Sequence, residues 1–209
     1  MEYIDLEHWK RKEHFQFFYR MDYPQYNICA NLDATNFLQF VKSRELSFYY
    51  AMVYAATHAA NQIEEFLYRI REGRVIRHDR VHPSFTDLNG GADDLFKIVN
   101  VEMKEDIFEF VKCAADQSRG QTAYFPFEVM AGRDDFIYIT CIPWVSFTHL
   151  SHTVTLNRDD ATPRISWGKY FTENGRVLLP FSVQVHHALA DGVHVGRYLG
   201  KLQKLMDEM

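Results

Sequence analysis

A strand, a short loop and a helix follow one another near the C-terminus, and this pattern constrains the fold more than any other part of the sequence. Apolar residues alternate from Val177 to Val185, which predicts a strand. After residues 186–192 comes a stretch with helical apolar spacing, at Val193, Val195, Tyr198, Leu199, Leu202 and Leu205. A strand that leads into an amphipathic helix favours a sheet with helices packed against it.

The connecting loop reads His186-His187-Ala188-Leu189-Ala190-Asp191-Gly192. Histidine is the side chain whose ordinary pKa lies nearest neutrality, so it can take a proton from a hydroxyl and return it within one turnover. A structural interpretation is equally open from this motif alone. In it, Asp191 is the N-cap of the helix, Gly192 eases the turn, and one histidine is a satisfied core residue. The surrounding sequence decides between the two interpretations.

Composition limits the class of protein. The 209 residues carry a net charge of −5, whereas a general nucleic-acid binder usually has a basic surplus. No apolar run approaches the length of a membrane span, and the acidic start lacks the basic and apolar regions of a signal peptide. The three cysteines are odd in number and lack metal-ligand spacing, which indicates reduced thiols. We therefore expect a cytoplasmic protein with one domain over residues 1–209, without a metal, membrane or nucleic-acid partner.

The remaining pattern mixes helices and strands without strict alternation. Apolar spacing and capping residues predict helices over residues 33–41, 47–67 and 105–117. Strands are expected over residues 81–87, 95–103 and 136–147, and hairpins over residues 69–78 and 168–185. The hairpins turn at Glu72-Gly73 and at Glu173-Asn174-Gly175. This mixture favours an α+β fold, in which helices pack on a large mixed sheet.

Four further segments extend the signal over nearly the whole chain. They are Trp9-Lys10-Arg11-Lys12-Glu13-His14-Phe15, Val81-His82-Pro83-Ser84-Phe85-Thr86, Ile142-Pro143-Trp144-Val145-Ser146-Phe147, and Lys169-Tyr170 with the hairpin into Leu178-Leu179-Pro180. Together with residues 180–195, and in this order, they resemble the chloramphenicol acetyltransferase family. Similarity to the wider coenzyme-A acyltransferases, such as dihydrolipoamide acyltransferase cores, rests on the H-x-x-x-D-G motif alone. The resemblance implies a two-layer α/β sandwich of the CoA-dependent acyltransferase type, and a homotrimer with active sites between subunits.

The resemblance also implies catalytic roles. His187 would be the general base that removes the proton from an acceptor hydroxyl, which then attacks the thioester of acetyl-CoA; such help is worth roughly 10²–10⁴-fold in rate. Asp191 would pair with Arg11 and so hold the loop, because a buried carboxylate is best satisfied by a bidentate guanidinium. Thr140 stands where the family usually has a serine that donates a hydrogen bond to the oxyanion. Taken alone, Thr140 is also an ordinary strand residue.

Binding residues follow from the same resemblance. Lys169, Tyr170 and Tyr49 match positions near coenzyme A, while Ser47 replaces a second family lysine that serves the same phosphate. The tyrosines are equally compatible with ordinary packing. The positions that match the acceptor pocket are Phe17, Phe18, Phe125, Leu150, Val154 and Ser166.

Three positions depart from the family's apolar acceptor pocket: Asp22, His152 and Arg164 stand where aliphatic residues are usual. Residues 131–135 also resemble a small insertion. Polar side chains in such a pocket need hydrogen-bond partners or water.

Three hypotheses for the function remain. The first, from the resemblance, is a chloramphenicol O-acetyltransferase that uses acetyl-CoA. The second keeps this chemistry but has a more polar hydroxyl acceptor. The third is a non-catalytic ligand-binding homologue; the scattered histidines set aside a metal hydrolase.

Overall fold

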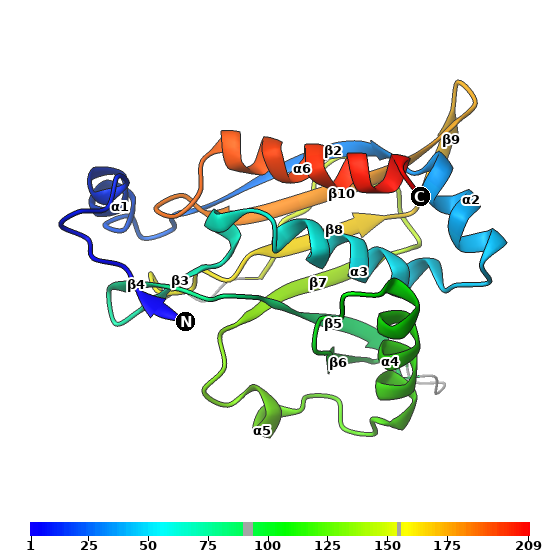
Figure 1. The fold of residues 1–209 in the computed structure, drawn as a ribbon, viewed down its shortest axis with the longest axis horizontal. Helices are drawn as coiled ribbons and strands as arrows, with labels where there is room; N and C mark the ends of the chain where they lie inside the picture. Colours follow the sequence, from blue (N-terminus) through cyan, green and yellow to red (C-terminus); the bar gives the residue numbers. More distant parts are fainter. Residues whose placement is uncertain (90–93, 154–155) are drawn as a thin grey trace.

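A large mixed sheet forms one layer of the protein and helices form the other (Figure 1). The computed structural model describes residues 1–89, 94–153 and 156–209. The seven strands of the sheet are β2 (Gln25–Asp33), β5 (His82–Leu88), β6 (Phe96–Asn100), β7 (Phe136–Ile142), β8 (Arg164–Gly168), β9 (Phe171–Glu173) and β10 (Arg176–His186). Their order is β2-β10-β8-β7-β5-β6, with β9 paired to β10. Only the β5–β7 and β7–β8 pairings are parallel.

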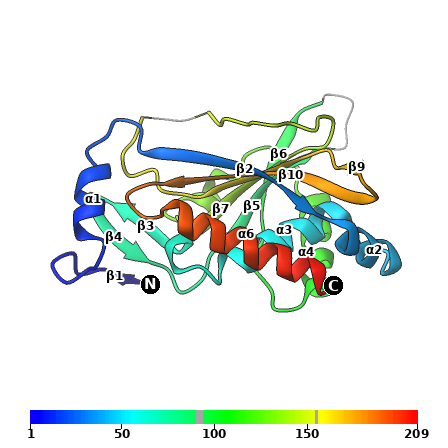
Figure 2. The same cartoon turned by 90° about the horizontal axis from the view of Figure 1, so that it is seen from above.

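The helices are α1 (Lys12–Phe18), α2 (Thr35–Ser43), α3 (Phe48–Ala60), α4 (Ile107–Gly120), α5 (Phe127–Met130), α6 (Gly192–Asp207) and the 3₁₀ turn η1 (Glu64–Phe66). Of these, α2, α3, α4 and α6 pack on one face of the sheet, whereas α1 lies beyond the end of the sheet (Figure 2). A small second sheet joins β1 (Glu2–Tyr3), β4 (Arg74–Arg77) and β3 (Tyr68–Arg71). In the part of the chain that is described, no helix is both long and apolar enough to cross a membrane.

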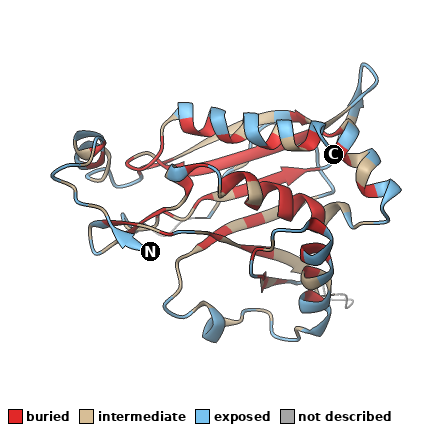
Figure 3. Ribbon diagram, in the orientation of Figure 1, coloured by how far each residue is buried: buried red, intermediate tan, exposed pale blue. Residues whose placement is uncertain are grey.

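The core lies between the sheet and the helices, where buried residues gather on β10, β8 and α3 (Figure 3). Successive strand residues point to opposite faces, so Val183, Ile165 and Ile139 pack toward the helices. Ser182, Ser166 and Thr140 are neighbours in register across β10, β8 and β7 and therefore share the other face. The irregular connection between β7 and β8 runs over this second face (Figure 2).

Local signals predicted several elements well. Both hairpins form at the expected turns, where Glu72, Gly73, Asn174 and Gly175 all have positive φ. The predicted helices at residues 33–41 and 105–117 correspond to α2 and α4, and the C-terminal helix is α6. The α+β fold with a large mixed sheet is confirmed.

Three boundaries were wrong. The helix expected to reach residue 67 ends at Ala60, where the Asn61 amide donates to the carbonyls of Thr57 and Val81 and so turns the chain. The strand expected to reach residue 147 ends at Ile142, because Pro143 has no N–H to continue the ladder. The strand expected over residues 95–103 is the shorter β6.

Candidate functional site

His187 lies just after the end of β10, in a setting that fixes its ring. Its backbone N–H donates to the Pro24 carbonyl at 2.9 Å. The Phe18 ring, from the end of α1, stacks on the imidazole with 3.8 Å between centroids and 7° between planes. Tyr26 of β2 contacts the same ring at a centroid distance of 4.6 Å. The imidazole is therefore oriented by two aromatic side chains that lie far from it in the sequence.

The nitrogen Nδ1 of His187 is buried, although about a third of the side chain is exposed. It lies 3.3 Å from Oδ1 of Asp191, without the alignment of a hydrogen bond. A carboxylate beside Nδ1 favours the tautomer that carries its proton there. Nε2 is then the nitrogen able to accept a proton from a ligand.

Arg11 and Asp191 form the ion pair that the sequence predicted. The guanidinium donates from Nη1 to Oδ2 at 2.5 Å and from Nη2 to Oδ1 at 3.0 Å, and Nη2 also reaches the His187 carbonyl at 3.4 Å. These hydrogen bonds from Arg11 lower the pKa of Asp191, against the opposing effect of burial. Asp191 is also the N-cap residue of α6, as the structural interpretation expected, while its role in supporting a catalytic loop stays a prediction.

His186 is a hydrogen-bonded neighbour rather than a second base. Its Nδ1 accepts from the Ala188 N–H at 3.2 Å, and its Nε2 donates to the Arg158 carbonyl at 3.1 Å. Burial lowers the pKa of His186 to about 4. Both ring nitrogens are thus used in holding the loop with the ring neutral.

A second support for the loop escaped the sequence analysis. The Asp191 N–H donates to Nδ1 of His194 at 2.8 Å, and Nε2 of His194 lies 3.2 Å from Oε1 of Glu65. His194 occupies the third helical position, where a capping box has Glu or Gln. An Asp-x-x-His pattern at a helix start was therefore the available signal, but Glu65 lies too far away in the sequence to be linked with it.

A cavity of about 710 Å³ opens between the start of α3 and the ends of β7 and β8. The three residues predicted to bind the cofactor, Tyr49, Lys169 and Tyr170, all line it, together with Thr140 and the two tryptophans Trp144 and Trp167. Gly168 also lines this cavity. No larger residue fits at this position, because a Cβ would lie 2.5 Å from the Val145 carbonyl oxygen. The predicted cofactor residues are therefore brought together.

A smaller cavity of about 220 Å³ adjoins the first on the second face of the sheet. Thr140 and Thr86 line both cavities. Ser166 is fully buried beside this cavity, and its hydroxyl lies 3.4 Å from Nε2 of His152. The two cavities thus meet at the hydroxyl predicted to face the reacting centre.

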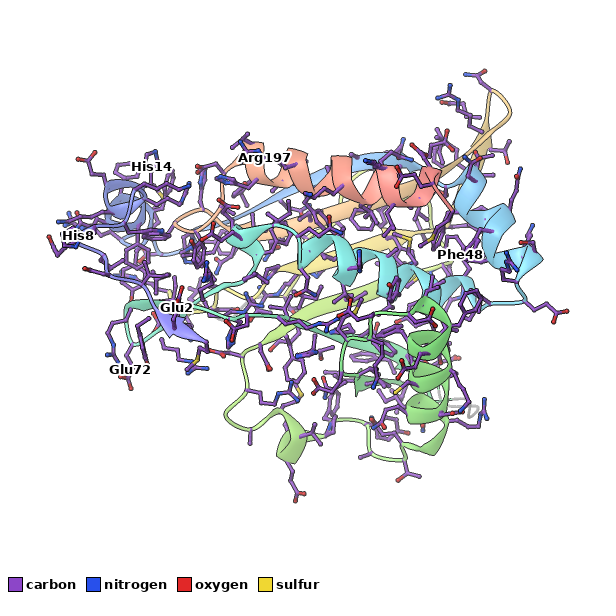
Figure 4. The ribbon with its side chains drawn as sticks, in the orientation of Figure 1. Glu2, His8, His14, Phe48, Glu72 and Arg197 are labelled. Carbon is purple, nitrogen blue, oxygen red and sulfur yellow. The ribbon has the colours of Figure 1, made fainter. Side chains whose placement is uncertain are left out.

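His187 lies away from these cavities within one chain. Ser182 of β10 is the register partner of Ser166, and His187 is five residues further along, which is roughly 16 Å at the usual strand rise. Figure 4 shows His14 of α1 toward one end of the long axis, and Phe48, which lines the larger cavity, toward the other. One chain therefore presents His187 and the cavities at different places.

The residues predicted for the acceptor pocket are divided accordingly. Phe18 is at His187, and the exposed Phe17 packs edge-on against Phe18. The Leu150 carbonyl accepts from the Asn27 amide on the second face of the sheet, where Ser166 also lies. Phe125 instead contacts Phe96 and Phe127 at the β6 edge. Val154 lies outside the described residues.

Comparison with known proteins gives the family. A family model described as chloramphenicol acetyltransferase matches residues 1–203. The chain belongs to the chloramphenicol acetyltransferase family. A chloramphenicol acetyltransferase from Klebsiella sp is 33% identical over 208 residues, which are 98% of this chain and 93% of the relative. Membership in this family makes the chain an acyltransferase.

Solved structures agree with this assignment. One chloramphenicol acetyltransferase structure has a TM-score of 0.90 and 27% identity, and the match covers 98% of this chain and 99% of the other. The cubic core of a pyruvate dehydrogenase multienzyme complex matches with a TM-score of 0.70 at 16% identity, over 88% and 81% of the two chains. The second likeness shows the shared acyltransferase fold alone.

The three polar departures from the pattern of the chloramphenicol acetyltransferase family each have a partner. Asp22 is exposed and accepts from Arg158 at 3.2 Å. Arg164 is mostly buried and donates to Asp160 at 2.6 Å. His152 lies beside Ser166, and burial lowers its pKa, as does the nearby positive charge of Arg164. Of these three residues, His152 and Arg164 line the smaller cavity, and Asp22 does not.

Proposed function

We propose that this protein is an O-acetyltransferase that transfers the acetyl group of acetyl-CoA, its co-substrate, to a hydroxyl of chloramphenicol. The observation that carries the proposal is the His187 loop. The imidazole of His187 stacks on Phe18, and the Asp191 carboxylate lies beside its Nδ1. Arg11 neutralises the charge of that carboxylate. The relatives named chloramphenicol acetyltransferase support the choice of acceptor.

In the proposed mechanism, Nε2 of His187 accepts the proton of the acceptor hydroxyl, while the oxygen of that hydroxyl attacks the carbonyl carbon of the thioester. Electrons move onto the carbonyl oxygen, and the Thr140 hydroxyl donates a hydrogen bond to this oxyanion. In other acyl-transfer enzymes such a donor is worth about 2.7–4 kcal/mol. When the oxyanion collapses, the C–S bond breaks and the thiolate takes the proton from His187. The ester and free CoA leave with the histidine neutral again.

The larger cavity fits the chemistry of acetyl-CoA. Lys169 is exposed at its rim and would neutralise phosphate charge, while Tyr170 offers an aromatic ring and contacts Phe48 at a centroid distance of 5.8 Å. Tyr49 donates to the Thr86 carbonyl, and burial raises its pKa well above the ordinary value. Ser47 is the N-cap of α3, so one phosphate-binding lysine of the family pattern has become a capping residue.

We further propose a homotrimer in which His187 of one subunit faces the cavities of the next. The distance between His187 and Thr140 within one chain supports this arrangement, because direct proton transfer requires contact. A closed ring of three uses a heterologous interface, which brings different surfaces of successive copies together. We also propose a cytoplasmic location, from the resemblance to the chloramphenicol acetyltransferase family. The described residues contain no helix that is long and apolar enough to span a membrane.

Thiol release from acetyl-CoA, followed with a thiol-reactive dye and chloramphenicol as acceptor, tests the proposal. We expect rapid release that His187→Ala abolishes, and mass spectrometry should show one acetyl ester on chloramphenicol. Binding of acetyl-CoA and chloramphenicol without turnover would instead support a ligand-binding homologue. Slow hydrolysis of acetyl-CoA that depends on His187, without transfer, would mean that another hydroxyl compound is the acceptor.

A further inference from the structure

We propose that the smaller cavity is a subsite for a neutral, hydroxyl-rich part of the acceptor, and that His152 sets this preference. The inference rests on the proposed acetyltransferase function and goes beyond it in naming a further class of acceptor, besides chloramphenicol, that the cavity would favour. It starts from the position of the cavity: Thr140 and Thr86 line both cavities, so whatever occupies the smaller one lies next to the transfer centre.

The walls of this cavity carry several polar groups beside apolar surface. Hydroxyl groups come from Ser84, Thr86, Tyr138, Thr140 and Thr153, and His152 adds an imidazole. The apolar side chains of Phe85 and Ile139, whose residues also border it, point to the helix face of the sheet and belong to the core, whereas Ile98, the register partner of Thr86, adds apolar surface to the cavity. A flat apolar ring placed here would leave these polar groups without partners, which costs binding energy.

One of these hydroxyls lacks a partner. Ser84 is 3% exposed, and its Oγ is buried without a hydrogen bond in the described structure. Buried polar groups are normally satisfied by protein, water or ligand. A ligand hydroxyl or a water that bridges to the ligand would satisfy Ser84, whereas a hydrocarbon group would not.

The charges around the cavity favour a neutral ligand. Among the described residues that line it, Arg164 is the only cationic one, and its guanidinium is already paired with Asp160 at 2.6 Å. No Asp or Glu is among the described residues that line it. A carboxylate on the acceptor would therefore compete with Asp160 for Arg164, while hydroxyl groups need no counter-charge.

His152 is suited to read hydroxyl groups because it can both donate and accept. The burial that lowers its pKa keeps the ring neutral at pH 7. Nε2 faces the Ser166 hydroxyl at 3.4 Å, so the remaining ring nitrogen is the one available to a ligand. Replacing His152 with leucine would remove this group at similar bulk and make the cavity more apolar.

The experiment compares three acceptors: methyl β-D-glucopyranoside, its uronate analogue methyl β-D-glucuronide, and chloramphenicol. For wild type and His152→Leu, kcat/KM is measured for each. The matched control is His58→Leu, which removes a partly buried histidine from α3 in the other layer. We expect His152→Leu to lower kcat/KM for the glucoside roughly tenfold and to raise it for chloramphenicol, since one buried hydrogen bond is exchanged for apolar contact. The control should keep the wild-type ratio.

Ser84→Ala provides a second variant with little risk to folding. It should lower kcat/KM for the glucoside, mainly by raising KM, and leave kcat/KM for chloramphenicol within about twofold of wild type. The inference is overturned if the glucoside is not acetylated, if wild type prefers the uronate, or if His152→Leu leaves the ratio of glucoside to chloramphenicol unchanged. Failure of the proposed function is a separate result: thiol release would then be absent, or unaffected by His187→Ala, with every acceptor.

Discussion

The two faces of the large sheet use the same strands for opposite purposes. On β10, β8 and β7 the side chains of Val183, Ile165 and Ile139 enter the core under the helices. The residues next to them in sequence, Ser182, Ser166 and Thr140, lie in a row on the other face. Period-two alternation therefore separates core residues from the polar face that carries the predicted site residues Ser166 and Thr140. Substitutions on one face should change unfolding, and those on the other should change turnover.

Loss of the base is expected to have the largest effect, and it acts on turnover alone. His187→Ala should reduce kcat by about 10²–10⁴-fold, because general-base help disappears. Thermal unfolding should stay near that of wild type, since a third of the side chain is exposed and Nδ1 makes no hydrogen bond. Kinetics of thiol release and differential scanning fluorimetry on the same samples measure both. A large fall in Tm would place His187 among the stabilising residues instead.

Arg11 is expected to support both the stability of the fold and the position of His187. Arg11→Val should therefore lower both the free energy of unfolding and kcat. Its removal leaves Asp191 partly buried without its cation, which costs on the order of 3–5 kcal/mol. The loop that carries His187 would lose its support, and kcat should fall with stability. Urea unfolding and kcat are the measurements, with Arg176→Val, an exposed arginine on β10, as the control. Unchanged stability with full activity would contradict the role of the ion pair.

Adjacent residues of β8 give the sharpest test of the comparison. Ile165→Ala opens a cavity in the core and should lower the free energy of unfolding by about 2–5 kcal/mol. Ser166→Ala removes only a hydroxyl with a long hydrogen bond, so its cost should stay near 1 kcal/mol while acceptor KM rises. Equal destabilisation by the two substitutions would show that the second face is as structural as the first.

A separate effect, on acid stability, is expected from His186. Burial lowers the pKa of His186 to about 4, whereas the unfolded chain titrates near 6.5. The unfolded state therefore binds the proton first, and the stability that depends on neutral His186 is lost as pH falls from about 6.5 to about 4, by at most ~3 kcal/mol. His186→Gln should flatten this part of the profile. Urea unfolding at pH 7, 6 and 5 measures it, and parallel profiles for the two proteins would contradict the assignment.

Elements with local signals could be predicted from the sequence, and those fixed by distant partners could not. The turn at Asn174-Gly175 and the amphipathic α6 are encoded in consecutive residues. The strands β2 and β8 went unrecognised because both owe their place to β10. In the site, the pairing of Arg11 with Asp191 was predicted through family motifs. The contact of Tyr26 with His187 was not, because no motif links them.

The division of the site was visible only in three dimensions. The motifs that contain Thr140 and His187 predict one site, yet strand register places the two residues roughly 16 Å apart along the sheet. The sequence resemblance supplied a trimer as the explanation. The separation supports the proposed trimer, because neither residue can reach the other in one copy.

Mixing two inactive variants tests this central claim most directly. His187→Ala and Thr140→Val would be co-expressed with different affinity tags, and oligomers carrying both tags would be purified and assayed for acetyl transfer. If each site takes His187 from one subunit and Thr140 from the next, every mixed trimer that carries both tags has one intact site, which is about a third of the positions. The account predicts recovery of roughly that fraction of wild-type activity. Mixed oligomers as inactive as either parent would contradict it.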